Sequence, residues 1–237
     1  IPFYASFIIT LIFMSIFGIL IQIVVLRPLI GEPVISIIMV TIGLSIFFQA
    51  IMKWMFGVFA QPFPEIFSNK SISILGLNIQ TVYVMSGLIS IFIMISFAIF
   101  FKKSKLGLAM RATAFDQQAS QSLGVSVKEV FSAAWAISAL VSAVAGVVFG
   151  IVNGVSSGIS IIGIKVFPAV ILGGLDSVLG AVLGGMVIGI LENFAQYVDV
   201  QFLNVGNLYN IAPFYALIII LMIKPYGFFG TKDIERV

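Results

Sequence analysis

The sequence predicts an all-α polytopic membrane protein. Of its 237 residues, 61% are hydrophobic and only 9% are charged, and the mean hydropathy is +1.22. Uninterrupted apolar stretches reach about 20 residues, the length that a helix needs to cross the hydrocarbon core of a bilayer. A transmembrane barrel would instead alternate apolar and polar residues with a period of two. Helices are therefore favoured over strands.

Apolar runs that end at charged or turn residues define about seven membrane segments. They cover residues 3–26, 34–52, 82–101, 129–150, 161–175, 178–197 and 211–224. The segment 161–175 is short for a bilayer about 30 Å thick, and Pro168 interrupts it, so we expect a broken or re-entrant helix there. We expect one transmembrane domain over residues 1–237, with its amino-terminal part missing because the chain starts directly in an apolar run.

Basic residues indicate which loops face the cytoplasm. Five of them flank one polar stretch, which the positive-inside rule places inside the cell. They are Lys102, Lys103, Lys105, Arg111 and Lys128. Alternation then places the loop with Arg27 and the tail with Lys224, Lys232 and Arg236 inside, and residues 53–81, 151–160 and 198–210 outside. Within the outer loop 53–81, alternating Ser and Ile from Ser71 to Ile74 permit a small hairpin.

The polar stretch predicts a short cytoplasmic helix over residues 112–124. Phe115, Ala119 and Leu123 recur every fourth residue and so share one helical face. The remaining side chains should stay in water: Asp116, Gln117, Gln118, Ser120, Gln121 and Ser122. Gly124 supplies a left-handed cap that ends the helix. We interpret this helix as a docking surface for a cytoplasmic partner.

Glycines four residues apart indicate close contacts between helices. The pairs are Gly146 with Gly150, Gly180 with Gly184, and Gly185 with Gly189. Plain helix packing explains them, and a thin wall around a moving pathway is the alternative.

Two further groups are candidates for a translocation pathway. Gly173 and Gly174 precede Asp176, where unwound backbone could contact a polar substrate; an ordinary turn capped by Asp176 is the alternative. Thr41, Ser45 and Gln49 are four residues apart on one face of the second segment, alongside Gly43, and could line a polar path or bond a neighbouring helix. Glu192 is expected near the outer interface, solvated there rather than bound to substrate.

Several function classes are excluded by what the sequence lacks. Without histidine or cysteine, the usual metal ligands and the imidazole base are absent, so no metal site, cofactor or enzymatic activity is expected. The basic residues cluster at segment ends rather than in a groove, so nucleic acid is not expected as a partner. No segment reads G-x-x-x-x-G-K-[ST], so any use of ATP must come from another subunit.

The chain resembles the permease subunits of branched-chain amino-acid ABC importers. The resemblance runs through most of the chain and is carried by Arg27–Gly31, Thr41–Ser45, Gly107–Gly124, Gly163–Lys165 with Phe167, Leu172–Leu175, Gly180–Glu192 and Lys224–Gly230. It implies a multi-pass subunit of the plasma membrane that carries branched-chain or related apolar amino acids inward. It also implies a second permease, two cytoplasmic ATP-binding subunits and an extracytoplasmic solute-binding protein as partners.

The resemblance assigns coupling to the ATPases to one set of residues. They are Arg111, Phe115, Asp116, Ala119, Leu123 and Gly124. Two features depart from the family pattern: its usual amino-terminal region is not seen, and Asp176 stands where glycine is more common. The alternative functions are an ion-driven secondary transporter or channel, for which Glu192 is the candidate carboxylate inside a segment, and a structural membrane scaffold.

Overall fold

A computed structural model describes residues 2–64, 66–67, 71–74, 77–156, 158–175 and 177–230, which are mainly helical as predicted. The chain forms two compact units, Ile1–Ser157 and Gly158–Val237. Predictions that concern Asp176, Lys232 and Arg236 lie outside the described residues.

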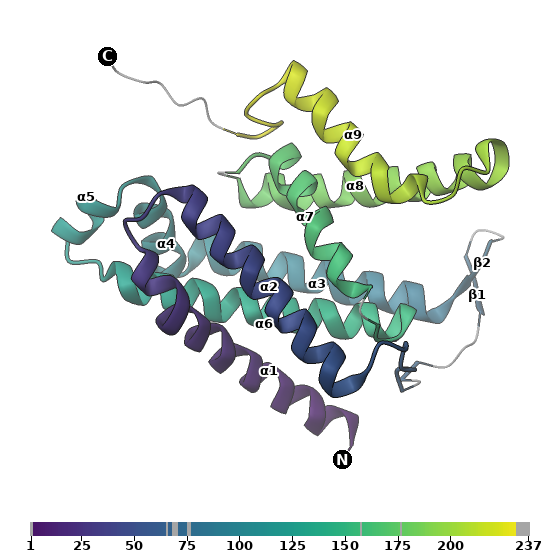
Figure 1. Cartoon of the computed structure of the whole chain (residues 1–237), viewed down its shortest axis with the longest axis horizontal. Coiled ribbons are helices and arrows are strands. Elements are labelled where there is room, and N and C mark those ends of the chain that lie inside the picture. The colour runs from purple at the N-terminus through teal and green to yellow at the C-terminus, as the bar shows by residue number, and fades with distance from the viewer. Residues whose placement is uncertain are drawn as a thin grey trace. The chain divides into compact units, whose positions relative to one another are not determined.

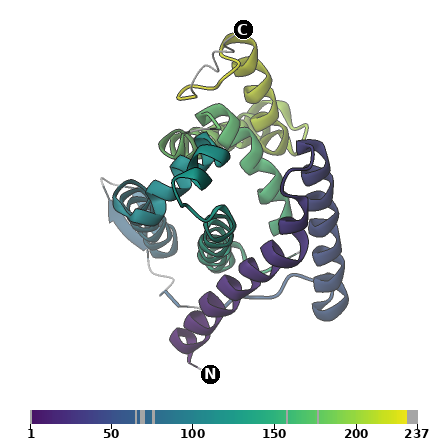
Figure 2. The ribbon, with the colours of Figure 1, turned by 90° about the vertical axis from the view of Figure 1, so that its left-hand side faces the viewer.

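The described part of the first unit contains six α-helices. They are α1 (Phe3–Ile21), α2 (Val34–Phe56), α3 (Thr81–Lys103), α4 (Lys105–Phe115), α5 (Gln117–Ser122) and α6 (Val127–Asn153). Helix α1 packs along α6 (Figures 1 and 2). The contact is close at Gly18, where a Cβ would lie 2.6 Å from the carbonyl oxygen of Trp135. A side chain at this position would therefore push the two helices apart.

A π-helical turn, Gln22–Leu26, extends α1 and leads into a 3₁₀ turn, Arg27–Leu29. The side chain of Gln22 is only 1% exposed, and its Oε1 accepts a hydrogen bond of 2.7 Å from the Ser132 hydroxyl on α6. Because a buried amide must be paired, this bond fixes the register of α1 against α6.

The two ends of the first unit differ in character. The hairpin predicted around Ile72 is confirmed: β1 (Ser71–Ile74) pairs antiparallel with β2 (Leu77–Gln80), with Ser71 opposite Gln80. In Figure 1 this hairpin lies at one end of the unit, and α4, α5 and the turn between α1 and α2 lie at the other. This arrangement agrees with the alternation of loops that the basic residues predict.

Within the described residues of the second unit there are three α-helices. They are α7 (Ile159–Gly173), α8 (Val178–Val198, continued by a π-helical turn Asp199–Leu203) and α9 (Leu208–Ile223). Their core consists of Ala169, Leu172 and Ile188, with Ala216 and Ile220 packed against it. Pro168 does not interrupt α7, which corrects the prediction of a broken helix: the proline is buried inside a continuous helix that ends at Gly173.

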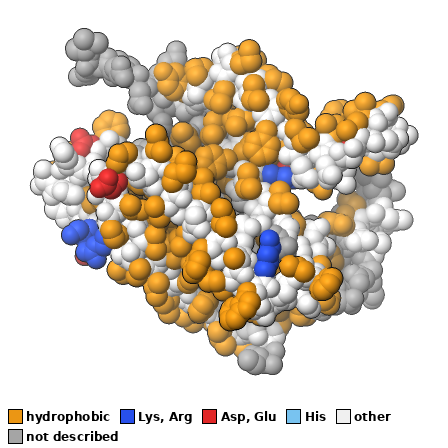
Figure 3. All heavy atoms as spheres, viewed as in Figure 1, with side chains coloured by type: hydrophobic (Ala, Val, Ile, Leu, Met, Phe, Trp, Pro, Cys, Tyr) orange, Lys and Arg blue, Asp and Glu red, His pale blue; other side chains and the backbone are white. Residues whose placement is uncertain are grey.

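Five stretches of the described chain are long and apolar enough to cross a membrane. They are Phe3–Leu29, Ile35–Phe56, Thr81–Lys103, Val127–Asn153 and Val178–Leu203, whereas α7 and α9 are shorter apolar helices. Many of the large hydrophobic side chains on these helices are exposed. Hydrophobic side chains are spread over the face in Figure 3, and the few charged ones lie partly at its left margin and partly nearer its centre. The chain is therefore a multi-pass membrane protein, since lipid is the solvent that such a surface requires.

Candidate functional site

The polar stretch between α3 and α6 forms two helices, not the single helix over 112–124 that the sequence predicts. Asp116 adopts an extended conformation (φ −154°, ψ 112°) between α4 and α5. Its Oδ1 accepts a hydrogen bond of 2.9 Å from the backbone N–H of Ala119. An aspartate that bonds a backbone N–H three residues later starts a new helix instead of continuing the old one. The break therefore separates Phe115 from the face that carries Ala119 and Leu123.

The α4–α5 surface nevertheless presents large apolar side chains to its surroundings. Phe115 is 95% exposed and Leu123 is 84% exposed, and Ala119 between them is also exposed. Ser120 is buried (3% exposed), contrary to the prediction that it stays in water, because the short helix α5 lies against α6. Two large apolar side chains this exposed on one polar stretch make the α4–α5 surface a candidate contact for a partner.

A left-handed glycine ends α5, as predicted. Gly124 has φ +84°. Its N–H donates to the Gln121 carbonyl (2.9 Å), and the N–H of Val125 donates to the Ser120 carbonyl (3.0 Å). This pair of bonds is a Schellman cap, and it holds Leu123 in a defined position.

Arg111 fastens α4 to the end of α3. Its guanidinium donates to the carbonyl oxygens of Phe101 and Lys102 and lies 5.4 Å from the centroid of the Phe101 ring. These carbonyls belong to the last turn of α3, which has no intrahelical partner for them. Arg111 is therefore a positioning residue rather than part of the exposed surface.

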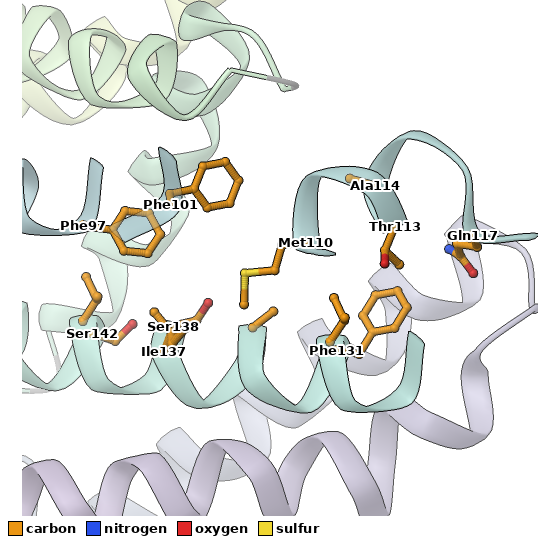
Figure 4. A pocket seen from close by; sticks show the side chains of 13 residues that line it. Phe97, Phe101, Met110, Thr113, Ala114, Gln117, Phe131, Ile137, Ser138 and Ser142 are labelled. Carbon is orange, nitrogen blue, oxygen red and sulfur yellow. The ribbon is translucent and has the colours of Figure 1, made fainter. Parts of the chain in front are cut away.

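A cavity of about 730 Å³ lies between α3, α4, α5 and α6 (Figure 4). Phe97 and Phe101 from α3, Met110 from α4 and Phe131 from α6 supply much of its lining, with Ser138 and Ser142 among its polar residues. The sequence gives no signal for this cavity because its lining comes from segments that are far apart in the chain.

The predicted glycine contacts fall into two groups. Gly180 and Gly184 lie where α7 crosses α8: a Cβ on Gly180 would overlap the carbonyl oxygen of Gly173, and one on Gly184 would overlap that of Ala169. A Cβ on Gly150 would lie 3.0 Å from a ring carbon of Phe63, which belongs to the loop after α2. The structure does not place the others at such contacts, because no described neighbour lies within 4 Å of a Cβ on Gly146, Gly185 or Gly189.

Gly173 and Gly174 lie under the carboxy-terminal tail. The N–H groups of Phe228 and Phe229 donate to the carbonyls of Leu172 (2.9 Å) and Gly173 (3.1 Å). Gly174 turns the chain with φ +103°. The carbonyls at the end of α7 therefore bond the tail and are not free for a substrate, which favours the turn over the unwound element. The sequence analysis did not predict this contact between Lys224–Gly230 and the end of α7. The glycines within Lys224–Gly230 were the signal that could have indicated it.

The polar residues of α2 bond within their own helix. The Thr41 hydroxyl donates to the Ile38 carbonyl (2.9 Å), and the Gln49 amide donates to the Ser45 hydroxyl (3.3 Å). Gly43 and Ser45 are exposed. The structure therefore leaves this face of α2 open within the first unit.

Glu192 has a charged partner that the sequence interpretation did not identify, and its place near the outer interface stays a prediction. Its Oε1 lies 3.0 Å from Nζ of Lys165 on α7, and that Nζ lies 4.9 Å from the centroid of the Tyr209 ring on α9. Opposite charges in neighbouring apolar segments were the signal for this pair, because an ionised group inside a membrane requires a partner.

Comparison with known proteins identifies related chains. The sequence profile of the family described as "Branched-chain amino acid transport system / permease component" matches residues 1–223. The chain is 31% identical to the high-affinity branched-chain amino acid transport system permease protein BraD of Pseudomonas aeruginosa, over 98% of this chain and 76% of that protein. It is 28% identical to the corresponding LivH protein of Escherichia coli K12 over the same shares of the two chains. A probable branched-chain amino acid transport permease protein LivH of Methanocaldococcus jannaschii is 27% identical over 72% of this chain and 55% of that protein. No solved structure matches the chain.

Proposed function

Because the chain belongs to the family of branched-chain amino acid transport permeases, we propose that it translocates branched-chain or related apolar amino acids inward across the plasma membrane, as the membrane-spanning subunit of an ATP-driven importer. The family is one of transporter permeases rather than of enzymes. We assign the five long apolar stretches and the two shorter apolar helices of the described chain to the membrane. Helix α7 either crosses the membrane or re-enters it.

The observation that carries the proposal is the exposed α4–α5 surface, with Phe115 and Leu123 as its anchors. The sequence contains no phosphate-binding loop, so ATP hydrolysis requires separate subunits. A short helix with exposed apolar side chains is suited to a hydrophobic groove on such a subunit. We therefore assign the ATPase contact to Phe115, Ala119 and Leu123, with Asp116 and Gly124 shaping the surface.

Coupling follows from how α4 and α5 are attached. Arg111 ties α4 to the last turn of α3, so a push on α4 reaches a membrane-spanning helix directly. The cavity behind α4 and α5 leaves room for them to move without displacing a packed core. Binding of ATP by the partner subunits then favours one of two arrangements of the bundle, and delivery of substrate favours the same transition from outside.

The remaining partners follow from the family and not from contacts within this chain. A second permease and an extracytoplasmic solute-binding protein complete the proposed importer. The exposed polar face of α2 with Thr41, Gly43 and Ser45 is the candidate wall of the pathway. An ion-driven carrier is not favoured, because the chain belongs to a family of permease components of branched-chain amino acid transport systems.

Co-purification with the cytoplasmic ATP-binding subunits tests the proposal. We expect Phe115→Asp and Leu123→Asp each to abolish co-purification and amino-acid uptake, since losing one anchor of an interface costs about 2–4 kcal/mol. Ile30→Asp is the control, because Ile30 is an exposed apolar residue (39%) of the turn after α1, outside the α4–α5 surface. ATPase capture at the wild-type level by both α4–α5 variants would contradict the docking role.

A further inference from the structure

We propose that Lys165, Glu192 and Tyr209 form a binding site for the charged head group of a zwitterionic amino acid during its passage. This inference rests on the proposed transport function and adds a substrate contact to it. The three residues come from α7, α8 and α9, and all lie in the second unit.

The pair is placed where charge is costly. Lys165 lies in the middle of the apolar helix α7. Glu192 lies roughly three helical turns before Leu203, where α8 and its π-helical extension end. Ionised side chains inside membrane segments are rare, and they usually mark the path of a substrate or an ion. A hydrophobic pair of similar volume would stabilise these helices at least as well, since desolvation offsets much of the attraction between two buried charges.

Both charged groups remain within reach of a ligand. The side chain of Lys165 is 13% exposed and that of Glu192 is 25% exposed, so neither is sealed inside the helix bundle. Oε1 of Glu192 is itself buried, and apart from its ion pair with Lys165 no described residue donates a hydrogen bond to it. The site can therefore open without breaking a wider network of hydrogen bonds.

An amino-acid zwitterion complements this pair in charge. Its carboxylate can take the place of Glu192 beside Lys165, while its ammonium group takes the place of Lys165 beside Glu192. Two ion pairs then replace one, and the net charge inside the membrane does not change. The Tyr209 ring already holds one cation on its face at 4.9 Å and can hold the ammonium group in the same way. A neutral solute or a simple ion offers no such exchange.

The site also lies at a useful depth. In the proposed orientation α7 starts outside the cell, and Lys165 is six residues beyond Ile159, or about 9 Å along the helix. A substrate released at the outer surface would therefore meet the pair early in its passage.

Transport by the reconstituted importer tests this inference. The complete complex is placed in liposomes with ATP, and uptake of radiolabelled L-leucine from the solute-binding protein is measured. A single variant leaves an unpaired charge in the membrane, so a loss of uptake could come from weaker substrate binding or from a destabilised fold. The informative variant is the double neutral Lys165→Gln with Glu192→Gln, which removes both charges together. We expect it to assemble and hydrolyse ATP but to take up leucine at least about tenfold more slowly, the factor that one lost charge-assisted hydrogen bond represents.

A second double variant and a control separate the explanations. The exchanged pair Lys165→Glu with Glu192→Lys keeps an ion pair of reversed polarity, and we expect it to lose uptake as well. Lys224→Gln is the control because Lys224 also lies over an aromatic ring, that of Phe228 at 5.3 Å, and has no carboxylate partner among the residues that the structure describes. Wild-type uptake by either double variant would show that the pair only holds the helices together and would overturn the inference. Failure of the unaltered complex to transport leucine would instead overturn the proposed function.

Discussion

The crossing of α7 and α8 allows a stability prediction with an internal control. Gly184 and Gly185 are neighbours on α8, but only Gly184 faces α7. A Cβ on Gly184 would overlap the carbonyl oxygen of Ala169 and lie 3.0 Å from the backbone nitrogen of Gly173, whereas a Cβ on Gly185 meets nothing within 4 Å. Backbone atoms cannot move aside as a flexible side chain can, so Gly184→Ala must separate the helices.

Apart from this contact, the two substitutions change the free energy of unfolding in the same way. Each replaces a helical glycine by alanine, which favours the helix by about 0.5–1 kcal/mol. The difference between them is therefore the cost of overpacking, about 1–3 kcal/mol. Unfolding of the purified chain in detergent, followed by circular dichroism, measures this difference. We expect Gly185→Ala to unfold at the same or a higher denaturant concentration than wild type, and Gly184→Ala at a lower one. Equal midpoints for the two variants would refute the close approach of α7 and α8.

Two further predictions concern the first unit. Gly124→Ala places a side chain at φ +84°, which costs about 1–2 kcal/mol. The backbone amides of α5 should therefore exchange their hydrogens faster than in wild type, while those of α6 do not change. An unchanged exchange rate in α5 would contradict the role of Gly124 as a cap. Ser132→Ala leaves the buried Oε1 of Gln22 without its donor and should destabilise the chain by about 1–3 kcal/mol in the same unfolding assay, whereas Ser122→Ala, which loses only an exposed intrahelical bond, should have little effect.

The helices could be predicted because long apolar runs leave few alternatives in a membrane. Each predicted segment overlaps a helix of the structure, and the ends differ by a few residues. The break at Asp116 could not be predicted from periodicity, since the spacing of Phe115, Ala119 and Leu123 continues across it. Only the local bond from Ala119 to the aspartate side chain decides between one helix and two.

Contacts between distant segments were the least predictable part of the candidate site. Lys165 and Glu192 are both visible in the sequence, but their pairing depends on how α7 lies against α8. Gly180 and Gly185 each begin a four-residue glycine repeat, and only the repeat from Gly180 faces another helix. Spacing shows which residues share a face of a helix. Only the structure shows whether that face points toward another helix.

The central claim, that the α4–α5 surface faces the cytoplasm and contacts an ATPase, can be tested by labelling. The chain contains no cysteine, so single cysteines report on one position each. In intact cells a membrane-impermeant maleimide should label Asn78→Cys in the outer hairpin but not Leu123→Cys. After permeabilisation Leu123→Cys should become labelled, and the ATP-binding subunits should protect it. Labelling of Leu123→Cys from outside intact cells, or no labelling after permeabilisation even without those subunits, would contradict the account.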